Sequence, residues 1–209
     1  MVSEGNRFAL ETCTEVFNHG QLATLTMPLV VKNRRNSIDN LRKAYGDAAI
    51  IDVTSRGSQP WVRFSPFYPH GEIPVPFSPG CFSMTVEGIW QGLKVFESAD
   101  VEPKKLTISN MKGIKRTQKT YGKVLGHRAG LTGNELLSYL EARRAIYLPS
   151  YKWVLENRLQ NLLNELKNLS ANKTVILLDY ETNCDLDDLS RPLSHAGLVK
   201  RYLENDWPE

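Results

Sequence analysis

Thr174-Val-Ile-Leu-Leu178 is a short run of β-branched and aliphatic residues without polar alternation, and Asp179 follows it directly. A run of this length and composition is typical of a strand that is buried on both faces. We expect it to lie in the central sheet, with Asp179 at the edge where ligands of α/β sheets bind. The stretch therefore predicts a sheet-containing domain with a ligand site near the carboxyl end of this strand.

Two further strands and several helices are predicted outward from this run. Leu29–Val31 and Ala48–Val53 are β-branched or buried strands, and Ser37–Tyr45 between them has a capping serine and helical spacing. Residues 155–166 carry leucines at helical spacing, Pro149 marks a helix start, and a last helix begins near Ser194. We expect an α+β (mixed α/β) fold over residues 29–209, helix-rich in its second half around a small sheet. Residues 1–28 are interpreted as an arm that packs loosely or forms a short helix around Phe8–Phe17.

Length, charge and cysteine content exclude several classes of protein. The chain has 209 residues, a net charge of +3 and three separated cysteines without a CxxC pair. One domain of this size is expected, and a disulfide framework, a zinc site and a wholly disordered chain are disfavoured. No apolar run approaches the ~20 residues that span a bilayer. We predict a cytoplasmic protein without a membrane partner and leave its oligomeric state open.

A proline-rich, aromatic stretch occupies residues 54–83. Proline fixes φ and removes a backbone donor, so this stretch cannot form a regular helix or a central strand. Two interpretations remain open: a stiffened loop that covers the core, or a wall that lines a ligand site. The aromatic residues that would form such a wall are Trp61, Phe64, Phe67, Tyr68, Phe77 and Phe82.

The next stretch, Thr85–Phe96, has apolar residues at helical spacing and predicts one helix. On that helix Glu87, Gln91 and Lys94 would form a polar stripe beside Trp90, with Glu87 in the first turn. Glu87 is either a solvated first-turn residue or a carboxylate that polarises a bound ligand. The amide, ammonium and aromatic neighbours count against the first role, and both roles remain open here.

Three other features are weaker candidates. The loop after Leu178 carries several carboxylates, among them Asp185, Asp187 and Asp188. This loop is a solvated turn, a source of a catalytic carboxylate or a metal site, although its spacing is not that of a calcium loop. Residues 104–128 hold eight basic residues and no acidic ones, which is a solvated surface or a patch for nucleic acid. His195 is a core or capping residue, or an acid/base group. Thr132–Glu135 matches a capping box before a further helix.

Three blocks follow one another in the middle of the chain: Phe64-Ser-Pro-Phe-Tyr-Pro69, Thr85-Val-Glu-Gly-Ile-Trp-Gln91 and Lys94-Val-Phe96. In these blocks the chain resembles the NADAR superfamily of YbiA-like N-glycosidases. Gly126–Arg128, the helix with Trp153 and the acidic segment Leu178–Asp185 are similar to later elements of that family. Pro66 and Gly88 depart from the family pattern, and the closing motif is absent.

The resemblance implies hydrolysis of the C–N bond between a base and the ribose of ADP-ribose or ribose phosphate, without a metal or redox cofactor. The substrate would be a small nucleotide or an ADP-ribosylated base, with nucleic acid as a possible carrier. The departures leave open an alternative, a sensor module that binds such a nucleotide without cleaving it. The implied catalytic residues are Glu87, Asp179 and Asp185, and the implied substrate-binding residues are Arg63, Phe64, Phe67, Tyr68, Trp90, Gln91, Lys94, Arg128 and Trp153.

Overall fold

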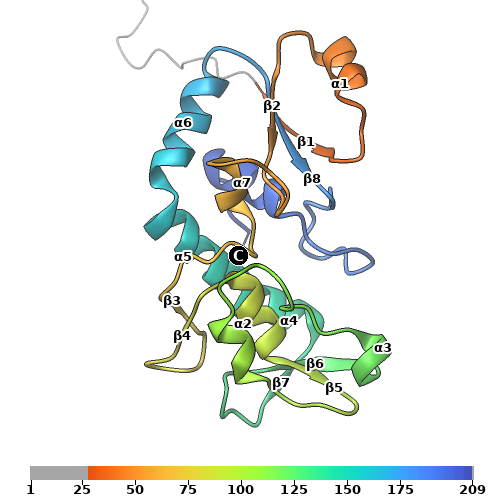
Figure 1. The fold of residues 1–209 in the computed structure, drawn as a ribbon, viewed down its shortest axis with the longest axis vertical. Helices are drawn as coiled ribbons and strands as arrows, with labels where there is room; N and C mark the ends of the chain where they lie inside the picture. Colours follow the sequence, from red (N-terminus) through yellow and green to blue (C-terminus); the bar gives the residue numbers. More distant parts are fainter. Residues whose placement is uncertain (1–27, 209) are drawn as a thin grey trace, which may run out of the picture.

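The computed structural model describes residues 28–208. A three-stranded sheet with its helices forms one end of an elongated molecule, and a second part with two small sheets forms the other (Figure 1). The arm expected over residues 1–28 lies outside the described residues, apart from Pro28. The α+β class is confirmed. Within residues 28–208, no helix combines the length and apolar character that crossing a membrane requires.

The central sheet consists of β1 (Leu29–Asn33), β2 (Ala49–Asp52) and β8 (Val175–Asp179), in the order β1-β8-β2. Both outer strands run parallel to β8, and Ile176 is in register with Val30 on one side and Ile50 on the other. All five residues of β8 are buried. The predicted central position of this strand is confirmed, and the carboxyl ends of all three strands meet at one edge.

The two faces of β8 pack against different helices, which explains why its sequence lacks polar alternation. Val175 and Leu177 belong to the main core, whereas Ile176 and Leu178 pack with Leu41 of α1 (Ile38–Tyr45). Helices α6 (Gln160–Ser170) and α7 (His195–Leu203) contact the sheet. Each face of the strand is therefore covered, one by α1 and the other by the main core.

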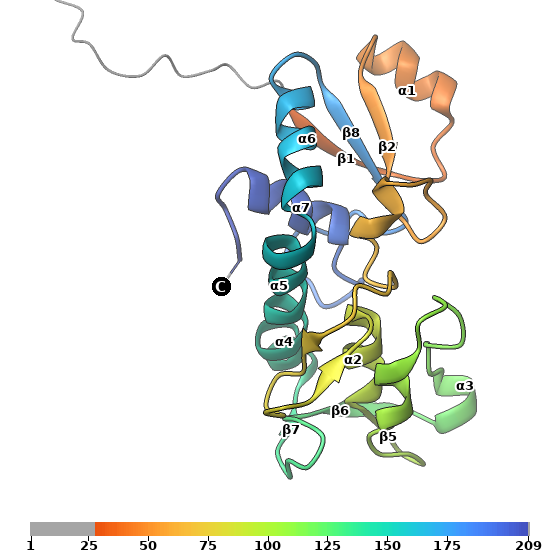
Figure 2. The ribbon, with the colours of Figure 1, turned by 60° about the vertical axis from the view of Figure 1, so that its left-hand side comes forward.

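A column of helices connects the two ends of the molecule (Figure 2). It contains α4 (Tyr139–Ala142), a π-helical segment (Arg143–Tyr147), α5 (Leu148–Arg158) and α6. The capping box predicted at Thr132–Glu135 is wrong. The box is formed instead by Ser138 and Glu141, because residues 136–137 pair with β6 as the short strand β7 (Leu136–Leu137).

The second part is built around α2 (Val86–Gly92), with β5 (Lys94–Phe96) and β6 (Val124–Arg128) beneath it. The single helix predicted over Thr85–Phe96 therefore stops early. The carbonyl of Gly92 accepts from the N–H of Glu102, and the carbonyl of Leu93 accepts from Arg128, so neither is available to continue the helix. The remaining elements are β3 (Ile73–Pro74), β4 (Phe82–Ser83), α3 (Gln118–Tyr121) and 3-10 turns at Trp61–Phe64 and Pro103–Thr107.

Candidate functional site

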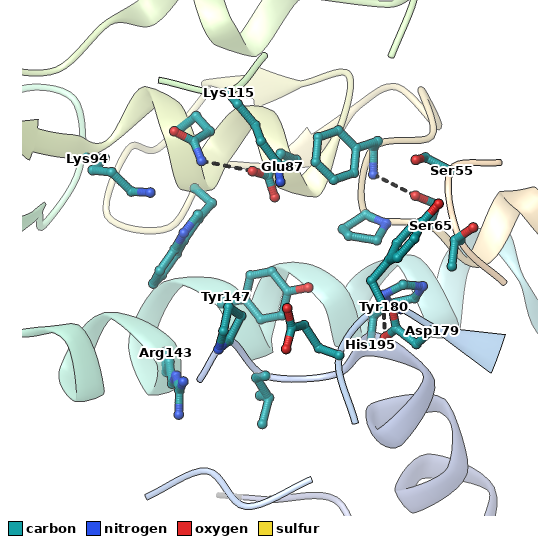
Figure 3. Close-up of a pocket in the computed structure, with 18 of the residues that line it drawn as sticks. Ser55, Ser65, Glu87, Lys94, Lys115, Arg143, Tyr147, Asp179, Tyr180 and His195 are labelled. Atoms are coloured by element: carbon teal, nitrogen blue, oxygen red, sulfur yellow. Dashed lines mark hydrogen bonds and ion pairs between the residues drawn. The ribbon is translucent and has the colours of Figure 1, made fainter. Parts of the chain in front are cut away.

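A cavity of about 420 Å³ lies where the carboxyl edge of the central sheet faces α2 (Figure 3). Its walls come from the segments that follow β2 and β8, from residues 65–67, from α2 and β5, from the loop at 115–116, from the π-helical segment and from the start of α7. This volume is in the range of small-molecule sites. The cavity therefore draws together segments from nearly the whole described chain.

Glu87 is the buried carboxylate on the α2 side of the cavity, with 7% of its surface exposed. Its backbone N–H donates to the carbonyl of Pro66 (2.8 Å), and the Thr85 hydroxyl caps the helix by accepting from the N–H of Gly88 (2.8 Å). A Cβ at position 88 would lie 2.7 Å from the carbonyl oxygen of Lys105, so only glycine fits there. The solvated role for Glu87 is thus excluded.

Gln91 fixes the orientation of Glu87. The side-chain oxygen of Gln91 accepts from the backbone N–H of Arg116 (3.0 Å), which turns its NH₂ group toward Glu87. That NH₂ donates to Oε1 of Glu87 (2.8 Å). No hydrogen bond to Oε2 of Glu87 forms within residues 28–208, and this oxygen remains for a ligand.

We expect Gln91→Met, which keeps the volume but removes both hydrogen bonds, to lower the free energy of unfolding by about 1–3 kcal/mol. The Arg116 N–H and the Glu87 carboxylate would each lose a buried partner. Denaturant unfolding measures the change, with the exposed Gln118→Met as the matched control. Equal stability of the two variants would contradict the orienting role.

Burial sets the protonation behaviour of the two ionisable groups on this side. Desolvation raises the pKa of Glu87, against the opposing effects of the Gln91 hydrogen bond and of the charges on Lys94 and Lys115. Desolvation also lowers the pKa of Lys94, partly offset by the charge of Glu87. Both pKa values therefore move toward neutral pH, as expected for groups that exchange protons with a ligand.

Aromatic rings with cations above them form part of the cavity wall. The Lys94 ammonium lies 5.7 Å from the centre of the Trp90 ring, and the Lys115 ammonium lies 5.4 Å from that of Phe67. Trp90 is held in place by edge contacts with Tyr139 and Tyr147. Such surfaces suit a flat ring that carries polar edges.

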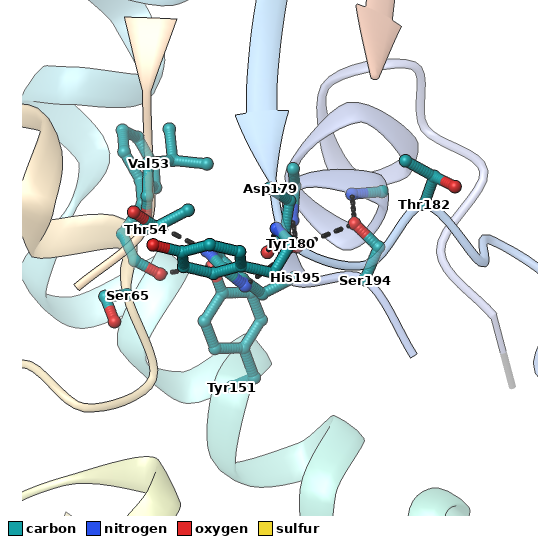
Figure 4. A network of polar contacts seen from close by, with 12 residues as sticks. Val53, Thr54, Ser65, Tyr151, Asp179, Tyr180, Thr182, Ser194 and His195 are labelled. Atoms are coloured by element: carbon teal, nitrogen blue, oxygen red, sulfur yellow. Dashed lines mark hydrogen bonds and ion pairs between the residues drawn. The ribbon is translucent and has the colours of Figure 1, made fainter. Parts of the chain in front are cut away.

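Asp179, His195 and Ser194 form a buried network at the sheet edge (Figure 4). His195 Nδ1 lies 3.0 Å from Oδ2 of Asp179, and His195 Nε2 lies 2.9 Å from the carbonyl oxygen of Val53. A carbonyl and a carboxylate can only accept, so this placement favours the imidazolium form of the ring, in which both nitrogens carry a hydrogen. The Ser194 hydroxyl donates to Asp179 (2.8 Å) and accepts from the N–H of Gly197 (3.1 Å).

The pKa shifts of this pair agree with that geometry. Burial raises the pKa of Asp179, but the charge and hydrogen bond of His195 and the bonds from Ser194 and Ala196 together lower it to about 2. Burial lowers the pKa of His195, and Asp179 more than compensates, so the net shift is upward. Ser194 donates to Asp179 and not to His195, so these three residues are not a nucleophile–base triad.

The helical column supplies Tyr147 and Arg143. The π-helical segment between α4 and α5 brings both to the cavity. Arg143 donates to the carbonyls of Leu186, Asp188 and Arg191, so it holds the loop after β8. Burial raises the pKa of the Tyr147 hydroxyl well above its usual value of 10.0, and this hydroxyl remains a proton donor.

Six of the predicted site residues line the cavity. Glu87, Trp90, Gln91 and Lys94 come from α2 and β5, and Phe67 comes from the proline-rich stretch. That stretch therefore forms part of the cavity wall. Asp179 lines the same cavity from the opposite side, although its carboxylate is engaged by His195.

The other six predicted residues lie away from the cavity, and their expected placement is corrected. Phe64 is fully buried in the core, and Tyr68 packs on His70. The remaining four are held by other partners or face solvent: Arg63 donates to the carbonyl of Arg158, Arg158 lies over the Trp153 ring, Arg128 pairs with Asp100, and Asp185 is exposed and accepts from the N–H of Asp187.

Several cavity residues were missed by the sequence analysis. Glu181 lines the cavity from the loop after β8, where the sequence favoured Asp185. Lys115 was visible only as one of eight basic residues, and Tyr147 had no distinguishing neighbour. Glu181 could have been found from its position two residues beyond a buried strand. Lys115 and Tyr147 could not, because only tertiary packing brings them to the cavity.

The basic run at 104–128 and the acidic loop after Leu178 are the two other binding surfaces that the sequence left open. The basic run at 104–128 is divided among a 3-10 turn, α3 and β6, and Arg116 within it is buried and paired with Glu102 at 3.0 Å. Over residues 28–208, no group of three or more His, Cys, Asp or Glu side chains is placed to hold a metal ion. The metal interpretation of the acidic loop is thus unsupported there.

Comparison with known proteins identifies a family of unknown function. The chain belongs to that family, DUF6939, whose model matches residues 33–199. No curated protein and no solved structure matches the chain. The resemblance to the NADAR superfamily is thereby corrected, because the family that matches across the domain is a different one. The residue roles that the resemblance implied therefore rest on the geometry of this site alone.

Proposed function

We propose that this protein is an N-glycosidase that hydrolyses the C–N bond between a ribose and a base. The observation that carries the proposal is the Glu87 carboxylate, which is buried in a nucleoside-sized cavity. Gln91 holds one of its oxygens, and the other has no hydrogen-bond partner among residues 28–208. Aromatic rings and ammonium groups surround it. This combination suits a flat base joined to a sugar that becomes positively charged.

The carboxylate would act on the charge that develops during cleavage. As the C–N bond breaks, its electron pair moves to the base nitrogen and the ribose becomes an oxocarbenium ion. Oε2 of Glu87, on the wall of the cavity, would stabilise that cation more than it stabilises the neutral substrate. Gln91 keeps the carboxylate from rotating away.

Proton transfers complete the reaction. The departing base takes a proton from a donor near the aromatic wall, and Lys94, whose pKa is lowered by burial, is suited to that task. Water adds to the ribose carbon and gives its proton to a carboxylate. Glu87 and Glu181 both line the cavity and can accept it.

A second candidate is a module that binds a nucleotide without cleaving it. One observation favours it: Asp179, the carboxylate opposite Glu87, is occupied by His195, Ser194 and the N–H of Ala196 and is not free to activate water. Under this alternative Glu87 would only accept hydrogen bonds from the ligand.

Incubation with ribosylated bases and ribonucleotides, followed by mass spectrometry, distinguishes the two candidates. Release of free base and a reducing sugar at a rate proportional to protein concentration is expected from the N-glycosidase. Saturable binding by calorimetry without any free base after long incubation would overturn it in favour of the binding module.

The pH dependence of turnover tests the role of Glu87 separately. Because the ionised form is required and its pKa is raised, kcat/KM should rise about tenfold per pH unit below that pKa, in a limb displaced upward from the ordinary 4.5. Lys115 lowers the pKa of Glu87 by its charge, so Lys115→Gln should move this limb to higher pH. Lys119→Gln is the matched control, and an equal effect of both would contradict the assignment.

A further inference from the structure

A second hollow, of about 590 Å³, adjoins the cavity. The two share Ser55, Phe67, Lys115 and Tyr180 in their walls. Basic side chains dominate the second hollow, and we call them the cationic shelf: Arg34, Arg35, Arg56 and Lys115.

Most of the positive charge on the cationic shelf is unpaired. Arg34 is bonded to Asp52 at 2.7 Å. Within residues 28–208, Arg35, Arg56 and Lys115 form no ion pair with a carboxylate. Three cationic side chains are therefore available to a ligand at the mouth of the cavity.

The parallel sheet explains why these residues meet. Arg34 and Arg35 follow β1, and Arg56 follows β2, so both segments leave the same carboxyl edge. Local turns fix them there. Asn33 Oδ1 accepts from the N–H of Arg35 (2.9 Å), and Thr54 Oγ1 accepts from the N–H of Arg56 (3.2 Å).

We propose that the cationic shelf binds phosphate groups of a ligand whose base and sugar occupy the adjoining cavity. Guanidinium groups bind phosphate oxygens in pairs, and three uncompensated cations match the charge of a pyrophosphate better than that of a single carboxylate. The inference rests on the proposed function for the base and sugar. The substrate class is then a phosphorylated nucleotide, held by residues other than Arg63 and Arg128.

Binding of a nucleoside, its 5′-monophosphate and its 5′-diphosphate to the full chain tests this directly by calorimetry. Affinity should increase along the series and fall with salt, because the shelf is open to solvent. The double variant Arg35→Gln/Arg56→Gln should weaken diphosphate binding by about tenfold or more, on the scale of lost charge-assisted hydrogen bonds. Nucleoside binding should change less than about twofold, because the nucleoside does not reach the shelf.

Lys119→Gln/Lys167→Gln is the matched control, since it removes the same charge from exposed positions off the shelf. Equal weakening by the two double variants, or equal parent affinity for the three ligands, would overturn the proposal. The protein could instead bind inorganic pyrophosphate, more weakly in the Arg35→Gln/Arg56→Gln variant, and bind no nucleoside. That result would support the phosphate site on the cationic shelf and overturn the proposed function. If base is released equally fast from substrates with and without phosphate groups, the proposed function would stand and the role of the cationic shelf would be overturned.

A short single-stranded oligonucleotide identifies the source of the phosphates. If the shelf binds a nucleic-acid backbone, the oligonucleotide should bind more tightly than the diphosphate, with a steep salt dependence that the shelf variant reduces. If the ligand is a free nucleotide, the diphosphate should bind at least as tightly as the oligonucleotide.

Discussion

Replacing Glu87 by Gln should lower the turnover of a ribosylated base by at least about 10²-fold. The variant keeps the side-chain shape and an oxygen that accepts from Gln91, but it removes the charge that would stabilise the oxocarbenium ion. Base release under single-turnover conditions measures the effect on the chemical step. The exposed Glu165→Gln is the control and should retain parent activity.

The same variant should be at least as stable as the parent at neutral pH. The pKa of Glu87 is raised in the folded state. The contribution of neutral Glu87 to the stability of the folded protein is therefore fully present below about pH 4.5 and is lost as pH rises through the raised pKa. Glutamine remains neutral throughout. Loss of turnover together with an unchanged or higher melting temperature separates a catalytic role from a structural one, and unchanged turnover would refute the role.

Asp179→Asn should lower the free energy of unfolding by about 3–5 kcal/mol, because it removes one partner of a buried ion pair. His195 would lose the charge of the carboxylate beside its Nδ1. The Ser194 hydroxyl and the Ala196 N–H both donate to Oδ2, whereas the Tyr180 N–H donates to Oδ1 (2.7 Å), so a single amide oxygen cannot accept from both sides. Denaturant unfolding at pH 6 measures the change. Asp47→Asn, which disrupts an exposed pair with Lys173, should cost at most about 1 kcal/mol.

The pair also has a defined pH window. The contribution of Asp179 is present above its ordinary pKa of 3.8 and is lost as pH falls through about 2. The contribution of His195 is present below its ordinary pKa of 6.5 and is lost as pH rises through its raised value. Adding His195→Gln to Asp179→Asn should cost less than the sum of the two single changes. Strict additivity would show that the two side chains do not interact.

Local sequence was sufficient to predict those elements that depend on contacts between residues close together in the chain. The absence of polar residues from Val175–Leu178 indicates a strand covered on both faces, and the structure places it between two strands and two packing layers. The apolar spacing after Ser37 was enough to predict α1, although within residues 28–208 the Ser37 side chain forms no capping hydrogen bond. The first turn of α2 was also predictable, because Thr85 caps it within three residues.

Local sequence gave the wrong prediction where distant segments form hydrogen bonds with the backbone carbonyls that a longer helix would use. Val86, Ile89, Leu93 and Phe96 fit one helix, yet the chain changes to a strand at Lys94. The reason is that Glu102 and Arg128 take the carbonyls of Gly92 and Leu93. No window of local spacing contains those partners.

The central strand, the first turn of α2 and the position of Glu87 beside Gln91 could be predicted from local sequence, because each depends on contacts within a few residues. Which other groups share the cavity with Glu87 depends instead on packing between remote segments. Lys115, Tyr147 and Glu181 reach it from a loop, a helix and a strand end that are remote in sequence. The cationic shelf likewise exists only because parallel strands bring their carboxyl ends to one edge, whatever their separation along the chain.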